Sequence, residues 1–176
     1  MSAAPNATER DRSKIPAGYT WDLSPVYPSI DAWRTAKDAL IAQFPQIDAF
    51  RGTLGTSAVR LRDCLDLTTA ISKTFSRLYT YVSAQADIDT RDSGFLALQQ
   101  EIGQIGTDLS TRTAFIEPEI LGFDRTIVEG FLASEPGLAI HRMALDDILR
   151  RKDHTGTESE EKLIAEAGLM AESPGA

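Results

Sequence analysis

The chain has 176 residues, of which 42% are hydrophobic and 25% are charged, close to the average of globular proteins. A chain of this length buries roughly 70% of the surface that its unfolded form exposes, so it can fold as an ordinary domain. Its formal net charge of −8 repels phosphate groups and anionic lipids, which argues against nucleic acid or a membrane as the main partner.

Three features of the sequence predict a cytoplasmic protein. Residues 1–18 lack an apolar stretch of signal-peptide length and are expected to form a mobile, solvated arm. No apolar run approaches the roughly 20 residues that a membrane helix needs. Cys64 is the single cysteine, so no disulfide can form within the chain. One helical domain is expected over residues 19–170, followed by a flexible tail at residues 171–176.

The first ordered segment is expected to be an anchoring loop between Tyr19 and Tyr27. Two aromatic side chains and Leu23 can dock there, while Pro25 and Pro28 keep the backbone extended. A first helix should follow, capped by Ser29 and broken at Pro45. Its apolar residues recur at helical intervals: Ile30, Trp33, Leu40, Ile41 and Phe44.

Two longer apolar stripes predict an antiparallel helical hairpin. The first stripe is Leu61, Cys64, Thr68, Ile71, Phe75, Leu78 and Val82. The second stripe is Phe95, Leu98, Ile102, Ile105 and Leu109. Both alternate steps of three and four residues, and the segment 87–92 between them offers turn and capping residues. A short link between two such stripes favours antiparallel packing.

Gly103 and Gly106 fall inside the second of these helices. Each costs about 1 kcal/mol of helix propensity relative to alanine, and a close helix crossing would explain both. A phosphate-binding glycine loop is not supported, because no Lys-Ser or Lys-Thr follows and no strand precedes.

The remaining sequence predicts three more helical segments. Pro118 and Gly122 are expected to end the third helix. A short helix should cover residues 127–132, and a further helix should run from Leu138 through Ile148 to the basic residues 150–152. A last helix is expected to start at residues 157–160. No alternating strand pattern occurs, so the predicted class is all-α, with about five to six helices and no sheet.

The histidines do not form a metal-binding pattern. Helical zinc peptidases place two histidines four residues apart with a glutamate between them, as His-Glu-x-x-His. His141 and His154 are the only histidines and lie thirteen positions apart. His141 falls on an apolar stripe, where a satisfied, partly buried imidazole is expected. The sequence therefore predicts no catalytic residue, no cofactor-binding residue and no metal ligand in this chain.

Other reactive groups also have structural explanations. Cys64 lies on a core stripe with no basic cluster nearby in sequence, so a buried, inert thiol is expected. The acidic run 158–161 can complement a helix N-terminus without binding a cation. Tyr79 and Tyr81 could present hydroxyl groups to a substrate groove, although packing between helices also explains them.

Four segments together resemble the N-terminal region of the oligoendopeptidase F family of zinc metallopeptidases. The segments are Trp21-Asp-Leu-Ser-Pro-Val-Tyr27 with Trp33, Leu78-Tyr-Thr-Tyr81 leading into Asp89-Thr90, Phe115-Ile-Glu-Pro-Glu-Ile120, and Ile148-Leu-Arg-Arg-Lys-Asp-His154 followed by Glu160-Glu-Lys-Leu-Ile164. In order, they span nearly the whole chain, from about residue 19 to residue 169.

The resemblance implies an all-helical, non-catalytic N-terminal domain of a zinc metalloendopeptidase. It implies that this domain walls a cavity over the active site and restricts access to short peptides. The zinc and its ligands would belong to a C-terminal catalytic portion that this chain lacks, so the expected partners are that portion and oligopeptides. One alternative is an independent helical interaction module or dimerisation domain. Another is a subunit that a separate catalytic chain completes.

Overall fold

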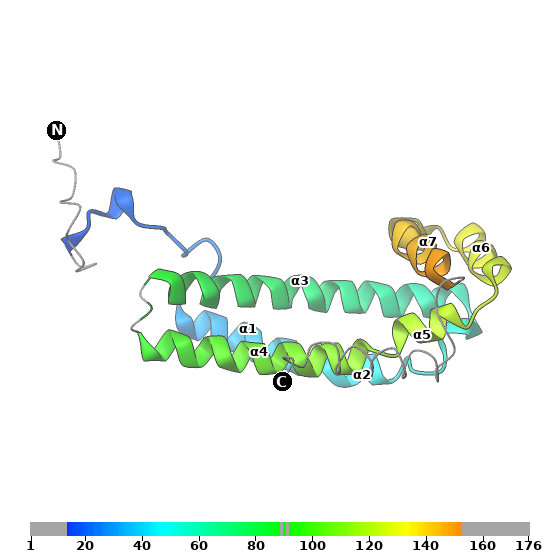
Figure 1. Cartoon of the computed structure of the whole chain (residues 1–176), viewed down its shortest axis with the longest axis horizontal. Coiled ribbons are helices and arrows are strands. Elements are labelled where there is room, and N and C mark those ends of the chain that lie inside the picture. Colours follow the sequence, from blue (N-terminus) through cyan, green and yellow to red (C-terminus); the bar gives the residue numbers. More distant parts are fainter. Residues whose placement is uncertain (1–13, 89, 91, 153–176) are drawn as a thin grey trace, which may run out of the picture. The chain divides into compact units, whose positions relative to one another are not determined.

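The described part of the chain is helical. The computed structural model describes residues 14–88, 90 and 92–152, which form seven α-helices and short 3-10 helices but no strand (Figure 1). The all-α prediction is confirmed over these residues. Five of the α-helices have ten or more residues, in agreement with the expected number of about five to six.

Two compact units make up the chain. Unit 1 comprises Met1–Gln43 and Ile71–Asp108, and unit 2 comprises Phe44–Ala70 and Leu109–Ala176. The divisions fall inside the two longest helices, α3 (Ala58–Ile88) and α4 (Ser93–Thr113), so each of these helices contributes residues to both units. Three predicted segments lie outside the described residues. They are residues 1–13 of the expected arm, the tail, and the helix expected from residue 157.

Helix α1 (Ile30–Ile41) of unit 1 begins where the sequence predicts. Ser29 is its N-cap, and the Ser29 hydroxyl accepts a hydrogen bond of 3.2 Å from the backbone N–H of Ala32. Helix α4 is capped in the same way, because Asp92 Oδ1 accepts bonds from Gly94 N at 2.8 Å and Phe95 N at 3.3 Å. Short polar side chains thus satisfy the first N–H groups of both helices.

Within unit 1, α3 and α4 form the predicted antiparallel hairpin (Figure 1). Gln99 donates a hydrogen bond to Ser83, and Gly106 lies against Phe75, so residue numbers rise along one helix as they fall along the other. Helix α1 packs on this pair. Its Trp33 is fully buried and donates from Nε1 to the carbonyl oxygen of Leu78 at 3.0 Å.

The expected anchoring loop docks through one aromatic side chain. Tyr27 is 9% exposed, and its ring meets that of Tyr81 edge-on at 5.5 Å between centroids. Arg77 donates to the backbone carbonyl of Val26 at 2.7 Å and so fixes the same end of the loop. Tyr19 and Trp21 are 61% and 70% exposed, so the expectation that two aromatics dock is wrong for this pair.

Unit 2 combines the first turns of α3 with several short elements. These are α2 (Phe44–Asp48), the 3-10 helix η3 (Leu54–Thr56), α5 (Ile116–Leu121), α6 (Arg125–Ser134), the 3-10 helix η4 (Pro136–His141) and α7 (Arg142–Arg151). Their core consists of fully or almost fully buried apolar side chains: Phe44, Ile47, Leu54, Leu61, Ile120, Val128, Leu138 and Leu145.

Two boundaries in unit 2 differ from the prediction. The third helix was expected to end at Pro118 and Gly122, but α4 ends at Thr113 and a separate helix, α5, contains Pro118. Pro118 is the third residue of α5, where a helix does not use the backbone N–H that proline lacks. The helix expected from Leu138 is also divided, because η4 ends at His141 and α7 follows.

The two glycines of α4 have different surroundings. A Cβ atom added at Gly106 would lie 2.7 Å from Cζ of Phe75, which confirms a close crossing there. A Cβ atom added at Gly103 would have no neighbour within 4 Å. The packing explanation is therefore wrong for Gly103. None of the described helices has the length and apolar character needed to cross a membrane.

Alanine substitutions at these glycines should have unequal effects on stability. Gly103→Ala should raise the free energy of unfolding by about 0.5–1 kcal/mol, because alanine is the better helix former and meets no neighbour. Gly106→Ala should raise the free energy of unfolding by a smaller amount, or lower it, because Phe75 must move. Urea unfolding followed by circular dichroism measures both variants. Equal gains would show that Phe75 does not restrict residue 106.

Candidate functional site

His141 occupies a satisfied, partly buried position, as the sequence predicts. It is 9% exposed, and its Nε2 atom lies 2.7 Å from Oδ1 of Asp66 on α3. His154 lies outside the described residues. Over residues 14–88, 90 and 92–152, no three His, Cys, Asp or Glu side chains are grouped closely enough to hold a metal ion.

A cluster of charged side chains continues from Asp66, which lies 3.9 Å from Arg62, and holds η4 against α3. Arg62 lies 2.6 Å from Asp63 and 3.1 Å from Glu135. Glu135 also caps η4, because its Oε1 accepts a 3.0 Å bond from Gly137 N. A side chain at Gly137 would lie 2.5 Å from Cδ of Arg62. Every group therefore has a partner within the fold, which indicates a structural role.

Glu119 on α5 holds together two segments of unit 2 that are distant in sequence. Its two carboxylate oxygens accept hydrogen bonds from Gly52 N at 2.8 Å and from Leu54 N at 2.7 Å. The turn that presents these N–H groups requires Gly52, whose φ is +72°. Hydrogen bonds to an ionised acceptor are among the stronger ones in proteins, so this carboxylate fixes the turn before η3.

Replacing Glu119 should therefore weaken unit 2. Glu119→Gln turns one accepting oxygen into a donor that faces a backbone N–H, and the free energy of unfolding should fall by about 1–3 kcal/mol. Glu117→Gln is the matched control on the same helix. Glu117 pairs with Arg151 at 2.5 Å, with both side chains 47% exposed, so its loss should cost at most about 1 kcal/mol.

Chemical denaturation of the two variants measures this difference. A Glu119→Gln variant as stable as Glu117→Gln would contradict the role given to Glu119.

Cys64 is buried on α3 and has no access to solvent. Burial raises the pKa of its thiol from 9.0 to about 11; the negative charge of Glu119 adds to this shift and Arg60 opposes it. The thiolate, which is the reactive form, is thus disfavoured at neutral pH. The prediction of a buried core position for Cys64 is confirmed, and its inertness stays a prediction.

The raised pKa makes stability depend on alkaline pH. The folded state holds the thiol proton more tightly than the unfolded state, so the stabilisation is complete below pH 9.0 and is lost as the pH rises towards about 11. The stability difference between the natural chain and Cys64→Ala should shrink by about 1 kcal/mol between pH 8 and roughly pH 10. Urea unfolding at both values tests this, and a constant difference would contradict it.

The two tyrosines predicted for a substrate groove lie in unlike surroundings. Tyr79 is 44% exposed and contacts Phe75, with 6.2 Å between ring centroids. Tyr81 is 5% exposed and packs on Tyr27. The structure does not bring them together on one open surface. Tyr79 is the one of the two whose ring is open to solvent, and the groove remains a prediction.

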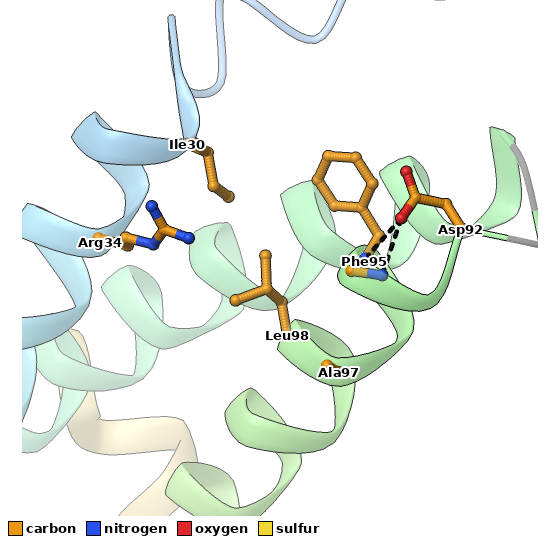
Figure 2. A pocket seen from close by; sticks show the side chains of 7 residues that line it. Ile30, Arg34, Asp92, Phe95, Ala97 and Leu98 are labelled. Atoms are coloured by element: carbon orange, nitrogen blue, oxygen red, sulfur yellow. Dashed lines mark hydrogen bonds between the residues drawn. The ribbon is translucent and has the colours of Figure 1, made fainter.

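The sequence patterns did not indicate the open apolar pocket that unit 1 carries between the first turns of α1 and α4. It has a volume of about 400 Å³ and is lined by Ile30, Arg34, Asp92, Gly94, Phe95, Ala97 and Leu98. Figure 2 shows Ile30, Phe95 and Leu98 pointing into the space, with Arg34 and Asp92 on opposite sides of it. A second hollow of about 260 Å³ is lined by Tyr19, Thr20, Trp21, Asp87 and Ile88.

Comparison with known proteins places this helical arrangement in one family. A family model described as Oligopeptidase F matches residues 119–176. Oligopeptidase PepF of Bacillus subtilis (strain 168) is 31% identical over 157 residues, which are 89% of this chain. The plasmid oligoendopeptidase F of Lactococcus lactis subsp. cremoris is 27% identical over 166 residues, or 94% of this chain.

The chain belongs to the oligoendopeptidase F family. It corresponds to the N-terminal region of the family's proteins. A crystal structure of a peptidase from Chlamydophila abortus shares the fold with a TM-score of 0.78 and 28% identity over 89% of this chain. Oligoendopeptidase-F from Enterococcus faecium aligns over 81% of this chain with a TM-score of 0.67 and 22% identity, which shows the fold alone.

The oligoendopeptidase F relatives are much longer than the region they share with this chain. The chain spans 23% of the Bacillus protein and 28% of the Lactococcus protein. It likewise covers 26% of the Chlamydophila chain.

Proposed function

We propose that this chain is the non-catalytic N-terminal helical domain of a zinc metalloendopeptidase that hydrolyses short peptides. The observation that carries the proposal is that nearly the whole chain aligns with the N-terminal quarter of proteins named oligopeptidase or oligoendopeptidase F. The zinc and the catalytic residues would belong to the longer C-terminal part of such a protein. Oligopeptides are the proposed substrates of the complete enzyme.

The residues of this chain support a non-catalytic role. Across all 176 residues, His141 and His154 are the only histidines and no His-Glu-x-x-His sequence occurs. His141 is engaged with Asp66, and the Cys64 thiol is buried and neutral at physiological pH. These groups do not fit a zinc site with an open position for water, so no step of peptide cleavage is assigned to them.

Within the complete enzyme, this domain would form part of the wall of the substrate cavity. The part of the α3–α4 hairpin that lies in unit 1 supports this role, because two helices packed side by side can present a surface to a neighbouring domain. Tyr79 is the proposed contact with peptides, since its ring is partly open to solvent. An independent interaction module remains the alternative.

A chimeric enzyme tests the proposal. The 157 residues of Bacillus subtilis oligopeptidase PepF that match this chain would be replaced by the chain itself. We expect the chimera to cleave a quenched fluorescent oligopeptide in the presence of zinc. The isolated chain with zinc, and the Bacillus protein without its matched region, should show no turnover above a heat-treated control.

Two results for the separate parts would each overturn the proposal. Zinc-dependent cleavage by the isolated chain would show that it carries its own catalytic centre. Full activity of the Bacillus protein without its matched region would show that the enzyme does not need this domain.

A further inference from the structure

The apolar stripe of α4 continues beyond the part that unit 1 buries. Ile102 is fully buried in the middle of the helix, whereas Phe95 and Leu98 nearer its start are only half-buried. Helix α1 lies over α4 at Lys37, which pairs with Glu101 at 2.5 Å, but α1 begins only at Ile30. The first turns of α4 therefore have an apolar side with incomplete cover from this chain.

The resulting pocket has more than enough room for an apolar side chain. Its volume of about 400 Å³ is at the lower end of the roughly 300–1,000 Å³ that ligand pockets span. Ile30, Phe95 and Leu98 form its apolar surface, and Gly94 and Ala97 leave it open because their side chains are small (Figure 2). Filling it would remove apolar surface from water, which is the main driving force of association.

The rim of the pocket carries one charge of each sign. The Arg34 side chain is 55% exposed and pairs with Asp31 at 3.1 Å. Asp92 lies on the other side of the opening, where its Oδ1 caps α4 (Figure 2). An apolar centre with a mixed polar rim is typical of interfaces between protein segments. A lipid acyl chain, by contrast, has no polar groups that could pair with these two charges.

The similar proteins indicate which polypeptide meets this surface. This fold covers 26% of the Chlamydophila chain and 23% of the Bacillus relative. Roughly three quarters of each polypeptide lies outside the part that corresponds to this chain and is available to contact it. An apolar pocket that its own domain leaves open is a suitable place for that contact.

We propose that the pocket between α1 and α4 receives an apolar side chain from the polypeptide that follows this region in the family. The proposal rests on the proposed function, because it requires this chain to be joined to, or associated with, the catalytic portion. The pocket is then a docking surface within the enzyme. Arg34 and Asp92 make polar contacts at its edge with the segment that carries this side chain.

Cysteine labelling in the chimera described above tests the proposal. Ala97→Cys places a thiol in the pocket, and Leu96→Cys is the matched control. Leu96 is 42% exposed, does not line the pocket and points about 100° away around the helix. Cys64 is buried, and the chimera without an introduced cysteine gives the background.

The reaction of a fluorescent maleimide distinguishes the outcomes. We expect Ala97→Cys to react about tenfold more slowly in the chimera than in the isolated chain, and Leu96→Cys to react equally fast in both. An active chimera in which Ala97→Cys remains fully reactive would overturn the docking surface and leave the proposed function intact. Equal protection of both cysteines would also overturn it, because the cover would not be specific to the pocket.

An inactive chimera in which both cysteines react as in the isolated chain would overturn both proposals. Tryptophan substitutions give a second, independent measurement. Ala97→Trp should fill the pocket and lower the thermal stability of the chimera, while Leu96→Trp should not. In the isolated chain the pocket is open, so Ala97→Trp should not lower the stability of the isolated chain, and neither should Leu96→Trp. If Ala97→Trp leaves the chimera as stable as Leu96→Trp does, the pocket is empty in the enzyme.

Discussion

The apolar stripe along α3 is the constraint on which the rest of the structure depends. Leu61 and Cys64 are fully buried in unit 2, and Leu78 and Val82 are fully buried in unit 1. The spacing of three and four residues keeps all of them on one side of a helix of 31 residues. The apolar cores of both units therefore depend on a single helix, and each unit adds its own polar contacts to it. In unit 1, Trp33 bonds to a carbonyl oxygen of this helix, and in unit 2, Asp66 and Arg62 hold η4 to it.

Much of this fold could be predicted from the sequence, because long helices carry many repeats of their pattern. The hairpin, the Ser29 cap and the all-α class depend on such local signals. The short elements were harder, and prolines show why. Pro45, Pro118 and Pro136 are the second, third and first residues of α2, α5 and η4. In the sequence a proline that ends one helix looks the same as one that starts the next, since the first turn of a helix tolerates it.

For the candidate site, the sequence mainly predicted which reactions these residues do not support. Two histidines thirteen residues apart and a thiol on a core stripe were sufficient to argue against hydrolysis by these groups. Of these, His141 and Cys64 are described by the structure, and both are buried within unit 2. The pocket was not predicted, because periodicity assigns Phe95 and Leu98 to a core without showing where the covering helix begins. For Trp21 the error is the opposite one. Its large apolar ring suggested burial, but the path of the loop leaves the ring exposed.

The arrangement of the two units along the chain also sets an order of events during synthesis. All residues of unit 1 have left the ribosome once Asp108 and the stretch that the exit tunnel holds have been made. Unit 2 then has only residues 44–70, and Glu119, which secures the turn at Gly52, comes later. Until α5 to α7 have also left the ribosome, the apolar residues Phe44, Leu54 and Leu61 lack half of their core. The nascent chain therefore passes through a stage in which one finished unit is attached to an unfinished, aggregation-prone one, and this is the stage at which chaperones would act.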